Sequence, residues 1–230
     1  MSDYKNVYEN KADSYDLLVS KEDYEKNILP AIQEIIDLKD IDVVELGAGT
    51  GRLTTMIAPL CRSIKILDSH EEMLKVAEKK LKKMNLTNWQ SIVADNRSIP
   101  LDEGIADLVI EGWAFGHLVE WNWDTWKEEI DKALHEMGKL LKPGGVAIII
   151  ETLGTGFKQP VPPSEKLQTF YNYLEKDLGF FHKFIRTDFQ FSSLKEAFHL
   201  VSIFWGENRA RDIVKSTIVP ECTGFWWVKR

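Results

Sequence analysis

The sequence predicts an α/β fold in which a mostly parallel β-sheet is covered by helices on both faces. Short apolar runs alternate with longer amphipathic stretches through the first two thirds of the chain, which is the pattern of β-α units on a parallel sheet. The runs are aliphatic or β-branched, as expected of strands that are buried on both faces. A turn rich in glycine follows the first run directly. These observations predict a ligand-binding crevice at the carboxyl edge of the sheet.

Seven strands are expected along the chain, at residues 42–46, 63–67, 89–93, 106–110, 146–151, 183–191 and 224–229. Most of them are bounded by Gly, Asp or Asn, which end strands. Helical periodicity is expected at residues 24–38, 52–59, 71–84, 126–141, 164–178 and 193–205. The Lys-Pro-Gly-Gly segment at 142–145 ends a helix and turns the chain into the next strand. Residues 154–163 are rich in Gly and Pro and are expected to form a loop.

Length and composition indicate how the chain is organised. With 230 residues, 44% of them hydrophobic, it is long enough for one sizeable core and short for two. We expect a single domain over residues 1–230, with an N-terminal helical arm or lid over 1–40. A loop-and-helix insertion is expected over 152–182, near the expected substrate site. The polar start of the arm is compatible with a lid or with a mobile segment.

Charge and cysteine content argue against several classes of function. A net charge of -7 provides no overall basic field for nucleic acid, which is therefore not an expected partner. The first residues do not resemble a secretory signal, and no apolar run has the length of a membrane span. Cys61 and Cys222 are far apart in sequence, so neither a disulfide framework nor a metal site is expected. A cytoplasmic location is the default expectation.

The strongest local signal is the segment VVELGAGTG at residues 43–51. Its glycines allow the backbone to turn sharply and a ligand to come within contact distance. Taken alone, the segment is also compatible with a tight turn that binds nothing. A nicotinamide dinucleotide site is disfavoured, because Arg52 stands where that fingerprint requires Gly or Ala. Glu45 would also face a phosphate unfavourably, whereas it suits a cationic amino-acid tail.

Four segments together resemble the Rossmann-like S-adenosylmethionine-dependent methyltransferases, especially the branch of ubiquinone and menaquinone C-methyltransferases. They are VVELGAGTG, ILDSHEEML, VADNRSIPL and DLVIEGWAF, and the LKPGG turn at 141–145 also matches. The resemblance covers most of the chain. It implies a three-layer sandwich around a mostly parallel seven-stranded sheet whose last strand is antiparallel. It also implies S-adenosyl-L-methionine as the cofactor.

The resemblance assigns an expected role to each motif. The glycine turn would line the methionine part of the cofactor, Asp68 would accept both ribose hydroxyls, and Asp95 would accept the adenine amino proton. Judged singly, Asp68 fits a residue favoured by a helix dipole and Asp95 fits a turn residue. Their joint position at the carboxyl edge of the sheet supports the cofactor interpretation. The expected cofactor-binding residues are Glu45, Gly47, Ala48, Gly49, Thr50, Gly51, Asp68, Ser69, Met73, Asp95, Asn96, Glu111 and Gly112.

A sulfonium methyl group is already electrophilic, so the protein has mainly to align the acceptor and exclude water. His117, just after the fourth strand, is the candidate general base, and a histidine that caps its loop is the alternative. The acceptor is expected to be a small, partly apolar molecule walled by Tyr15, Trp113, Phe115 and Phe157.

The sequence departs from the family at residues 111–113 and in the tryptophan-rich segment 121–126, whose rings fit an anchor for the following helix. Tyr8, Tyr15 and Asp16 match the family's N-terminal pattern. The predicted function is methyl transfer to a small molecule, and methylation of protein stays open. A non-catalytic S-adenosylmethionine-binding regulatory protein and a nicotinamide-dependent oxidoreductase are the alternatives. Neither the methylated atom nor the oligomeric state follows from the sequence.

Overall fold

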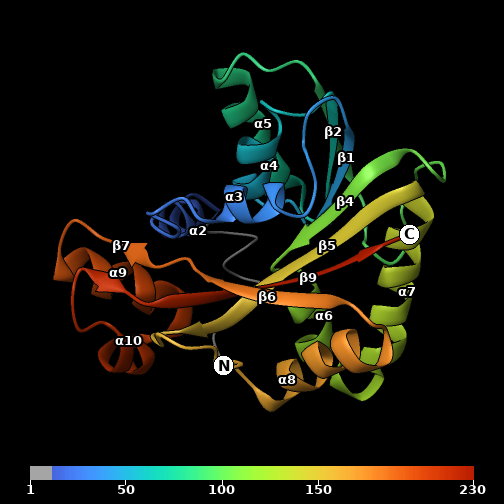
Figure 1. Cartoon of the computed structure of the whole chain (residues 1–230). Helices are drawn as coiled ribbons and strands as arrows, with labels where there is room; N and C mark the ends of the chain where they lie inside the picture. Colours follow the sequence, from blue (N-terminus) through green and yellow to red (C-terminus); the bar gives the residue numbers. More distant parts are fainter. Residues whose placement is uncertain (1–11) are drawn as a thin grey trace.

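A seven-stranded sheet in the order β3-β2-β1-β4-β5-β9-β6 forms the centre of the molecule (Figure 1). The computed structural model describes residues 12–230. Strands β1 to β5 are mutually parallel, whereas β9 is antiparallel to both of its neighbours, β5 and β6. The expected mostly parallel sheet with an antiparallel last strand is thus confirmed. The strands are β1 Asp42–Leu46, β2 Ser63–Asp68, β3 Trp89–Val93, β4 Ala106–Gly112, β5 Leu141–Thr155, β6 Phe181–Arg186 and β9 Glu221–Lys229.

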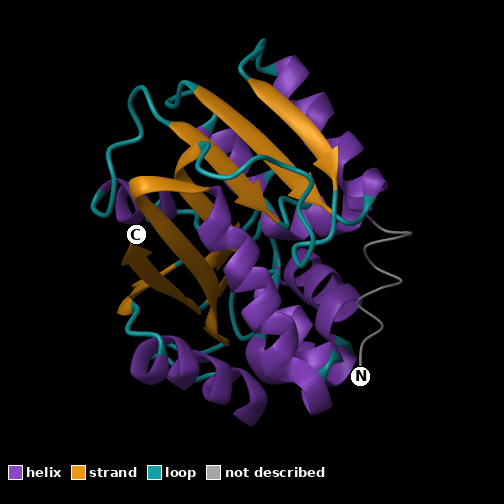
Figure 2. Ribbon diagram, turned by 90° about the vertical axis from the view of Figure 1, so that its right-hand side faces the viewer, coloured by secondary structure: helices purple, strands orange, loops and turns teal. Residues whose placement is uncertain are grey.

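Helices cover both faces of the sheet and make three layers, as the views in Figures 1 and 2 show. Alternate strand residues point to opposite faces, so Val43 packs with the first helix layer and Val44 with the second. The first layer consists of α3 Ile28–Gln33, α4 Arg52–Ile57 and α5 Glu71–Lys83. The second consists of α6 Phe115–Trp121, α7 Trp126–Leu140 and α8 Glu165–Asn172, with short turns at Trp123–Thr125 and Tyr173–Asp177.

A third, smaller apolar cluster lies at one end of the sheet, on the left in Figure 1. It joins the N-terminal helix α2 Ala12–Val19 to α9 Leu194–Trp205, α10 Glu207–Ile213 and the two-stranded sheet of β7 Phe189–Gln190 and β8 Ile218–Val219. Leu18 of α2 is buried in this cluster. Helix α2 is therefore packed against the C-terminal part of the chain.

The helix expected at 24–38 is much shorter in the structure, where α3 covers only Ile28–Gln33. The chain before it is a turn in which Asp23 and Lys26 have φ angles of 58° and 61°, a conformation that a right-handed helix cannot contain. The Asp23 carboxylate accepts hydrogen bonds from the backbone N–H groups of Asn27 and Ile28, at 2.7 and 3.0 Å. This local cap starts the helix four residues later than the apolar pattern predicts.

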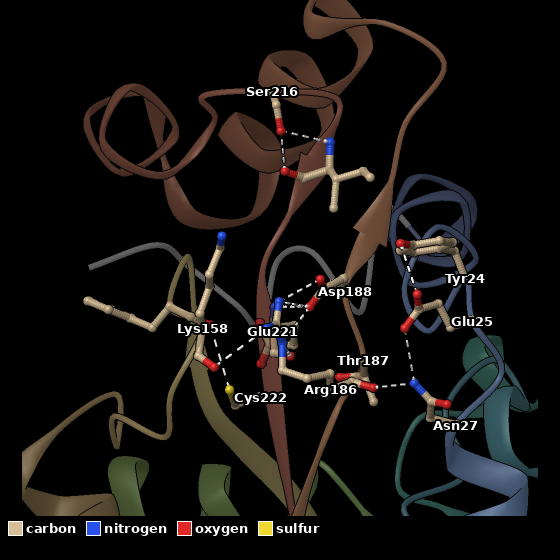
Figure 3. Close-up of polar contacts among 12 residues, drawn as sticks. Tyr24, Glu25, Asn27, Lys158, Arg186, Thr187, Asp188, Ser216, Glu221 and Cys222 are labelled. Carbon is tan, nitrogen blue, oxygen red and sulfur yellow. Dashed lines mark hydrogen bonds and ion pairs between the residues drawn. The ribbon is translucent and has the colours of Figure 1, made fainter.

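The strand expected at 183–191 is divided between two sheets. β6 ends at Arg186, and Phe189 and Gln190 pair with β8 instead of β9. Between them, the Asp188 carboxylate accepts hydrogen bonds from the Arg186 side chain and from the Glu221 backbone N–H, the latter at 2.9 Å (Figure 3). These contacts fix the point where the chain leaves the main sheet and where β9 enters it.

Other differences concern segments with weak sequence signals. Helices α6 and α10 were not expected, and β5 continues to Thr155, two residues into the loop predicted at 154–163. In the described part of the chain no helix has both the length and the apolar character needed to cross a membrane.

Candidate cofactor and acceptor site

The glycine turn between β1 and α4 has no room for a side chain at Gly47 or Gly51. Gly47 and Gly51 have φ angles of 65° and 81°, which residues with a Cβ rarely adopt. A Cβ on Gly47 would lie 2.4 Å from the Cβ of Ala114, and one on Gly51 would lie 2.8 Å from the Cβ of Ala77. The turn is therefore held closely between the loop after β4 and helix α5.

Asp68, the last residue of β2, ties the glycine turn to the start of α5. Its Oδ2 accepts a hydrogen bond from the Gly49 backbone N–H and its Oδ1 accepts one from the His70 backbone N–H, both at 2.8 Å. A carboxylate oxygen has two lone pairs, and the His70 ring Nδ1 also lies 3.3 Å from Oδ1, so acceptor capacity remains chiefly on Oδ2. Asp68 also lines the cleft described below. Its position fits the acceptor expected for a pair of hydroxyls.

Asp95, two residues beyond β3, is held by a residue that the sequence analysis missed. Arg97 donates from Nε to Oδ1 at 2.8 Å and from Nη2 to Oδ2 at 2.5 Å. These hydrogen bonds lower the pKa of Asp95 below its usual value, so that it is ionised at neutral pH. Arg97 also pairs with Glu129 of α7. The sequence signal available for this ion pair was a basic residue two positions after an acid that follows a strand.

These elements enclose a cleft of about 380 Å3 at the carboxyl edge of the sheet. Eleven of the predicted site residues line it: Tyr15, Gly47, Gly49, Asp68, Ser69, Met73, Asp95, Asn96, Gly112, Trp113 and His117. The other lining residues were not predicted: His70, Ala94, Arg97, Ala114, Leu118, Trp121 and Asn122. Three segments that are distant in sequence therefore meet at one site, namely the arm, the ends of β1 to β3, and the region after β4.

Seven predicted residues do not line this cleft. Ala48, Thr50 and Gly51 form the inner side of the glycine turn, and Glu45 and Glu111 are buried beneath it. Phe115, the first residue of α6, is completely buried in the core. Phe157 is 41% exposed and lies beside Arg209 of α10, with 5.7 Å from the guanidinium carbon to the ring centroid.

Glu45 illustrates why an acid inside a strand does not reach the ligand. Its carboxyl accepts a hydrogen bond of 2.6 Å from the Thr54 hydroxyl of α4. Burial raises its pKa to about 8, so it is mostly protonated at neutral pH. It therefore supports the packing of α4 against β1.

Aromatic side chains gather at the end of the cleft formed by the arm and the region after β4. Trp113 has a φ angle of 56°, which is rare for a bulky residue and marks a site where strain is held by the surroundings. The Arg52 guanidinium carbon lies 4.0 Å from the Trp113 ring centroid, a favourable cation–π distance. Trp121 stacks on His117 with centroids 5.0 Å apart.

The two ionisable rings in this wall are neutral at physiological pH. Burial lowers the pKa of His117 to about 4, and burial raises the pKa of the Tyr15 phenol. Neutral His117 is able to accept a proton, but its low pKa means that it holds that proton weakly. A general base works best with a pKa near the working pH, so His117 is a weak one.

The arm reaches the cleft through Tyr15 and is fixed by contacts on both sides. Asp16 pairs with Lys80 of α5, and the Tyr15 ring lies 5.7 Å from that of Phe204 in α9. Glu22 pairs with Arg52 at 2.7 Å. Tyr8 lies outside the described residues.

Comparison with known proteins identifies the family. A model of the methyltransferase domain family matches residues 43–145. A demethylmenaquinone methyltransferase of Staphylococcus carnosus is 30% identical over 182 residues, which is 75% of this chain and 68% of that protein. The residues matched by the family model thus include the glycine turn, Asp68, Asp95 and the strand that leads to Trp113.

Solved structures with low sequence identity share the fold. An S-adenosylmethionine-dependent methyltransferase from Aquifex aeolicus is 16% identical with a TM-score of 0.56, and the match covers 87% of this chain and 89% of the other. Phosphoethanolamine N-methyltransferase 1 of Haemonchus contortus is 17% identical with a TM-score of 0.55 over 99% of this chain and 48% of the other.

The family match and the cleft agree on the cofactor. A cradle of glycines, an acid at the end of β2 and a second acid after β3 all meet at one cleft, and the cofactor of the family is S-adenosyl-L-methionine. The chain is an enzyme that belongs to the class I, Rossmann-like S-adenosylmethionine-dependent methyltransferases, in the branch related to the ubiquinone and menaquinone C-methyltransferases.

Proposed function

We propose that this methyltransferase moves the methyl group to a small, partly apolar molecule by in-line displacement. The observation that supports this proposal best is the mixed lining of the cleft. Asp68, Asp95 and the glycine turn lie at the ends of β1 to β3, whereas Trp113, His117 and Trp121 follow β4 on the other side of β1 in the sheet, and the Tyr15 ring comes from the arm. Small-molecule sites combine such apolar walls with few polar groups.

The polar part of the cleft would orient the cofactor. In this proposal Gly47 and Gly49 admit its methionine part, Asp68 accepts the two ribose hydroxyls, and Met73 and Asp95 contact the adenine. S-adenosylmethionine supplies an electrophilic methyl group on a sulfonium sulfur. With the adenosine placed at Asp68 and Asp95, the methyl end points toward the aromatic part of the cleft.

The aromatic part would hold the acceptor and exclude water, which favours the reaction by alignment rather than by acid–base chemistry. His117 is the candidate base or hydrogen-bond acceptor in this wall, and its neutral imidazole is suited to the second role. The Staphylococcus carnosus relative is named for a reaction on demethylmenaquinone, a small molecule, which supports an acceptor of this class.

Two further parts of the proposal concern the rest of the chain. We propose that residues 1–230 act as a single domain in which the arm, residues 1–40, works as a lid through Tyr15, and that the segment 152–182 borders the acceptor. A cytoplasmic location is proposed as well, because Cys61 and Cys222 are both free and buried.

The experiment is a transfer assay in which the enzyme and S-adenosylmethionine with a labelled methyl group are incubated with a metabolite extract. The products are then separated into a small-molecule fraction, a protein precipitate and a nucleic-acid precipitate. Label is expected in a small molecule other than S-adenosylmethionine, and methyl transfer to protein alone would contradict the proposal.

A matched pair of variants tests the acceptor wall. Trp113→Ala is expected to lower the rate of transfer about tenfold or more, since loss of alignment of a bound acceptor is costly. Trp89→Ala, at the amino end of β3 and therefore at the opposite end of the strand from the cleft, is the control for loss of a tryptophan. If Trp113→Ala kept full turnover on the identified acceptor, the aromatic wall would not be the acceptor site.

A further inference from the structure

Two buried carboxyl groups lie together beneath the cleft. Glu111 of β4 pairs in register with Ile149 of β5, and Glu151 follows two residues later. Alternate strand residues share a face, so both acids point toward the layer of α6. Glu111 is 0% exposed and Glu151 is 3% exposed.

Both carboxyls bind the backbone at the start of α6. Glu111 Oε1 accepts hydrogen bonds from the N–H groups of Ala114 and Phe115, at 2.5 and 2.8 Å. Glu151 Oε1 accepts one from the N–H of Gly116, at 2.6 Å. The first N–H groups of a helix have no partner within the helix, and here two side chains from neighbouring strands provide the acceptors.

The fit between Glu151 and the helix is close. A Cβ on Gly116 would lie 2.9 Å from Glu151 Oε2, so any larger residue would push the helix away from β5. The helix held in this way presents His117, Leu118 and Trp121 to the cleft. The position of the two carboxyls therefore determines the position of one cleft wall.

The second oxygen of Glu111 indicates a shared proton. Glu111 Oε2 is buried, and no N–H or hydroxyl group of the described residues donates to it. The Glu151 carboxyl is close by, because the two acids bind the consecutive backbone N–H groups of Phe115 and Gly116. Two ionised carboxylates repel each other at such short range, so a proton held between them would satisfy Glu111 Oε2 and remove the repulsion.

The surroundings keep that proton in place. Burial raises the pKa of Glu111 to about 8, and burial together with the charge of Glu111 raises the pKa of Glu151 well above its usual value. Glu120 of α6 raises the pKa of Glu151 further. The phenol of Tyr171 in α8 is close enough to both carboxyls to be affected by their charge, and it is neutral because its own pKa is raised. The ionisable groups identified around the pair are thus acidic or neutral.

We propose that Glu111 and Glu151 are a pair of positioning residues that share a proton and so fix the α6 wall of the cofactor cleft. With the proton present, the two carboxyls are bonded to each other and to three N–H groups of α6. Without it, two like charges face each other in a buried site, and the start of α6 has to shift to separate or hydrate them. The cofactor cleft widens at His117 and Trp121 as a result.

Glu151→Gln tests this proposal, because an amide donates a hydrogen bond to Glu111 without an ionisable proton and its oxygen still accepts from Gly116. The assay is calorimetric titration with S-adenosylhomocysteine from about pH 6.5 to about pH 9.5. The variant is expected to bind within about twofold of the wild type at neutral pH. Over this range the ratio of wild-type to variant Kd is expected to rise by about fivefold or more, as the wild type loses the proton. Ionisation of the ligand cancels in this ratio.

Glu151→Ala removes both hydrogen bonds and is expected to raise the Kd about tenfold at every pH. Glu128→Gln is the matched control that removes an exposed acid from α7, and it should keep the wild-type pH profile. Equal pH profiles for the wild type and Glu151→Gln, or wild-type affinity in Glu151→Ala, would overturn the proposal.

Unfolding supplies a second readout that does not depend on the ligand. An acid whose folded pKa is raised stabilises the protein below its unfolded pKa, and this stability is lost as pH rises through the folded pKa. In the window from about pH 5 to neutral pH the unfolding equilibrium constant of the wild type should therefore rise relative to that of Glu151→Gln, by about tenfold per pH unit for one proton. If Glu151→Gln does not fold, Glu111→Gln removes ionisation from the other member of the pair, and the unfolding equilibrium constant of the wild type should rise with pH relative to that of this variant in the same way. If the ratio of the two unfolding constants does not change with pH, the shared proton is contradicted.

Discussion

Replacing Asp68 with alanine is the most direct test of the cofactor site, because this side chain has a structural role and a proposed binding role. In the structure its two oxygens accept hydrogen bonds from the backbone N–H groups of Gly49 and His70, both at 2.8 Å. The variant leaves these N–H groups without their acceptor, and it also removes the charged acceptor proposed for the ribose hydroxyls. Charge-assisted hydrogen bonds of this kind contribute about 1.5–3 kcal/mol.

The expected result for Asp68→Ala follows from that magnitude. A free-energy loss of about 1.4 kcal/mol corresponds to a tenfold change in Kd, so the Kd for S-adenosylhomocysteine should rise by more than about tenfold and up to about a hundredfold. Isothermal titration calorimetry measures it directly. Asp102→Ala, which removes an exposed acid from the turn before β4, is the control and should bind like the wild type.

Asp68→Asn separates the two roles of this side chain. Its amide oxygen can still accept from one backbone N–H, so the unliganded melting temperature should fall less than in Asp68→Ala, whereas loss of the charged ribose acceptor should still weaken binding. An unchanged Kd in Asp68→Ala would refute the assignment of β2 to ribose binding. A lower melting temperature with unchanged affinity would show that Asp68 only supports the turn.

Four further predictions follow from individual contacts. S-adenosylhomocysteine should raise the melting temperature with concentration, since a ligand at about a hundred times its Kd stabilises a fold by about 2.7 kcal/mol; no shift at millimolar ligand would contradict the cofactor site. Gly47→Ala should weaken binding because its Cβ would lie 2.4 Å from that of Ala114, whereas Gly138→Ala in α7, with open space around its Cβ, should bind normally and be slightly more stable. Burial raises the pKa of Glu45 to about 8 from a usual value of 4.5, so its contribution to stability is lost as pH rises from 4.5 to about 8. The free energy of unfolding in urea should therefore decline less over this pH range in Glu45→Gln than in the wild type. Burial lowers the pKa of His117 to about 4, so the transfer rate should show no ionisation of this residue between about pH 6 and about pH 8; a limb near pH 6.5 that disappears in His117→Gln would contradict the buried imidazole.

The architecture could be predicted from the sequence because it depends on patterns that are local. Each strand of the parallel part is a short apolar run that ends at a turn residue, and the helices α5 and α7 carry a clear apolar face. The glycine turn and Asp68 could be placed for the same reason, since both follow directly from the ends of β1 and β2. Parallel strands bring their carboxyl ends to one edge, so these residues had to meet.

The features that the sequence did not predict depend on contacts between distant segments. Helix α6 begins without a capping side chain of its own, because its N–H groups bind Glu111 and Glu151 from the strands behind it. The segment after β4, which was predicted to be a loop, is therefore helical. Its period then buries Phe115 and turns Trp121 toward the cleft, the reverse of the predicted assignment. The division of 183–191 likewise depends on which strand is available for pairing.

The position of an acid relative to the end of its strand determines whether it faces the cleft or supports it. Asp68 is the last residue of β2 and Asp95 comes two residues after β3, and both line the cleft. Glu45, Glu111 and Glu151 lie inside β1, β4 and β5, so the sheet and the helices cover their side chains, and burial raises the pKa of each. A carboxyl covered in this way is retained mostly in its protonated form and serves as a hydrogen-bond partner for a neighbouring helix. Acidic residues near the same edge thus have two uses. For Glu45 and Glu111, the last but one residues of β1 and β4, the distinction depends on a single position at the strand terminus, which is the part of an element that sequence patterns define least well.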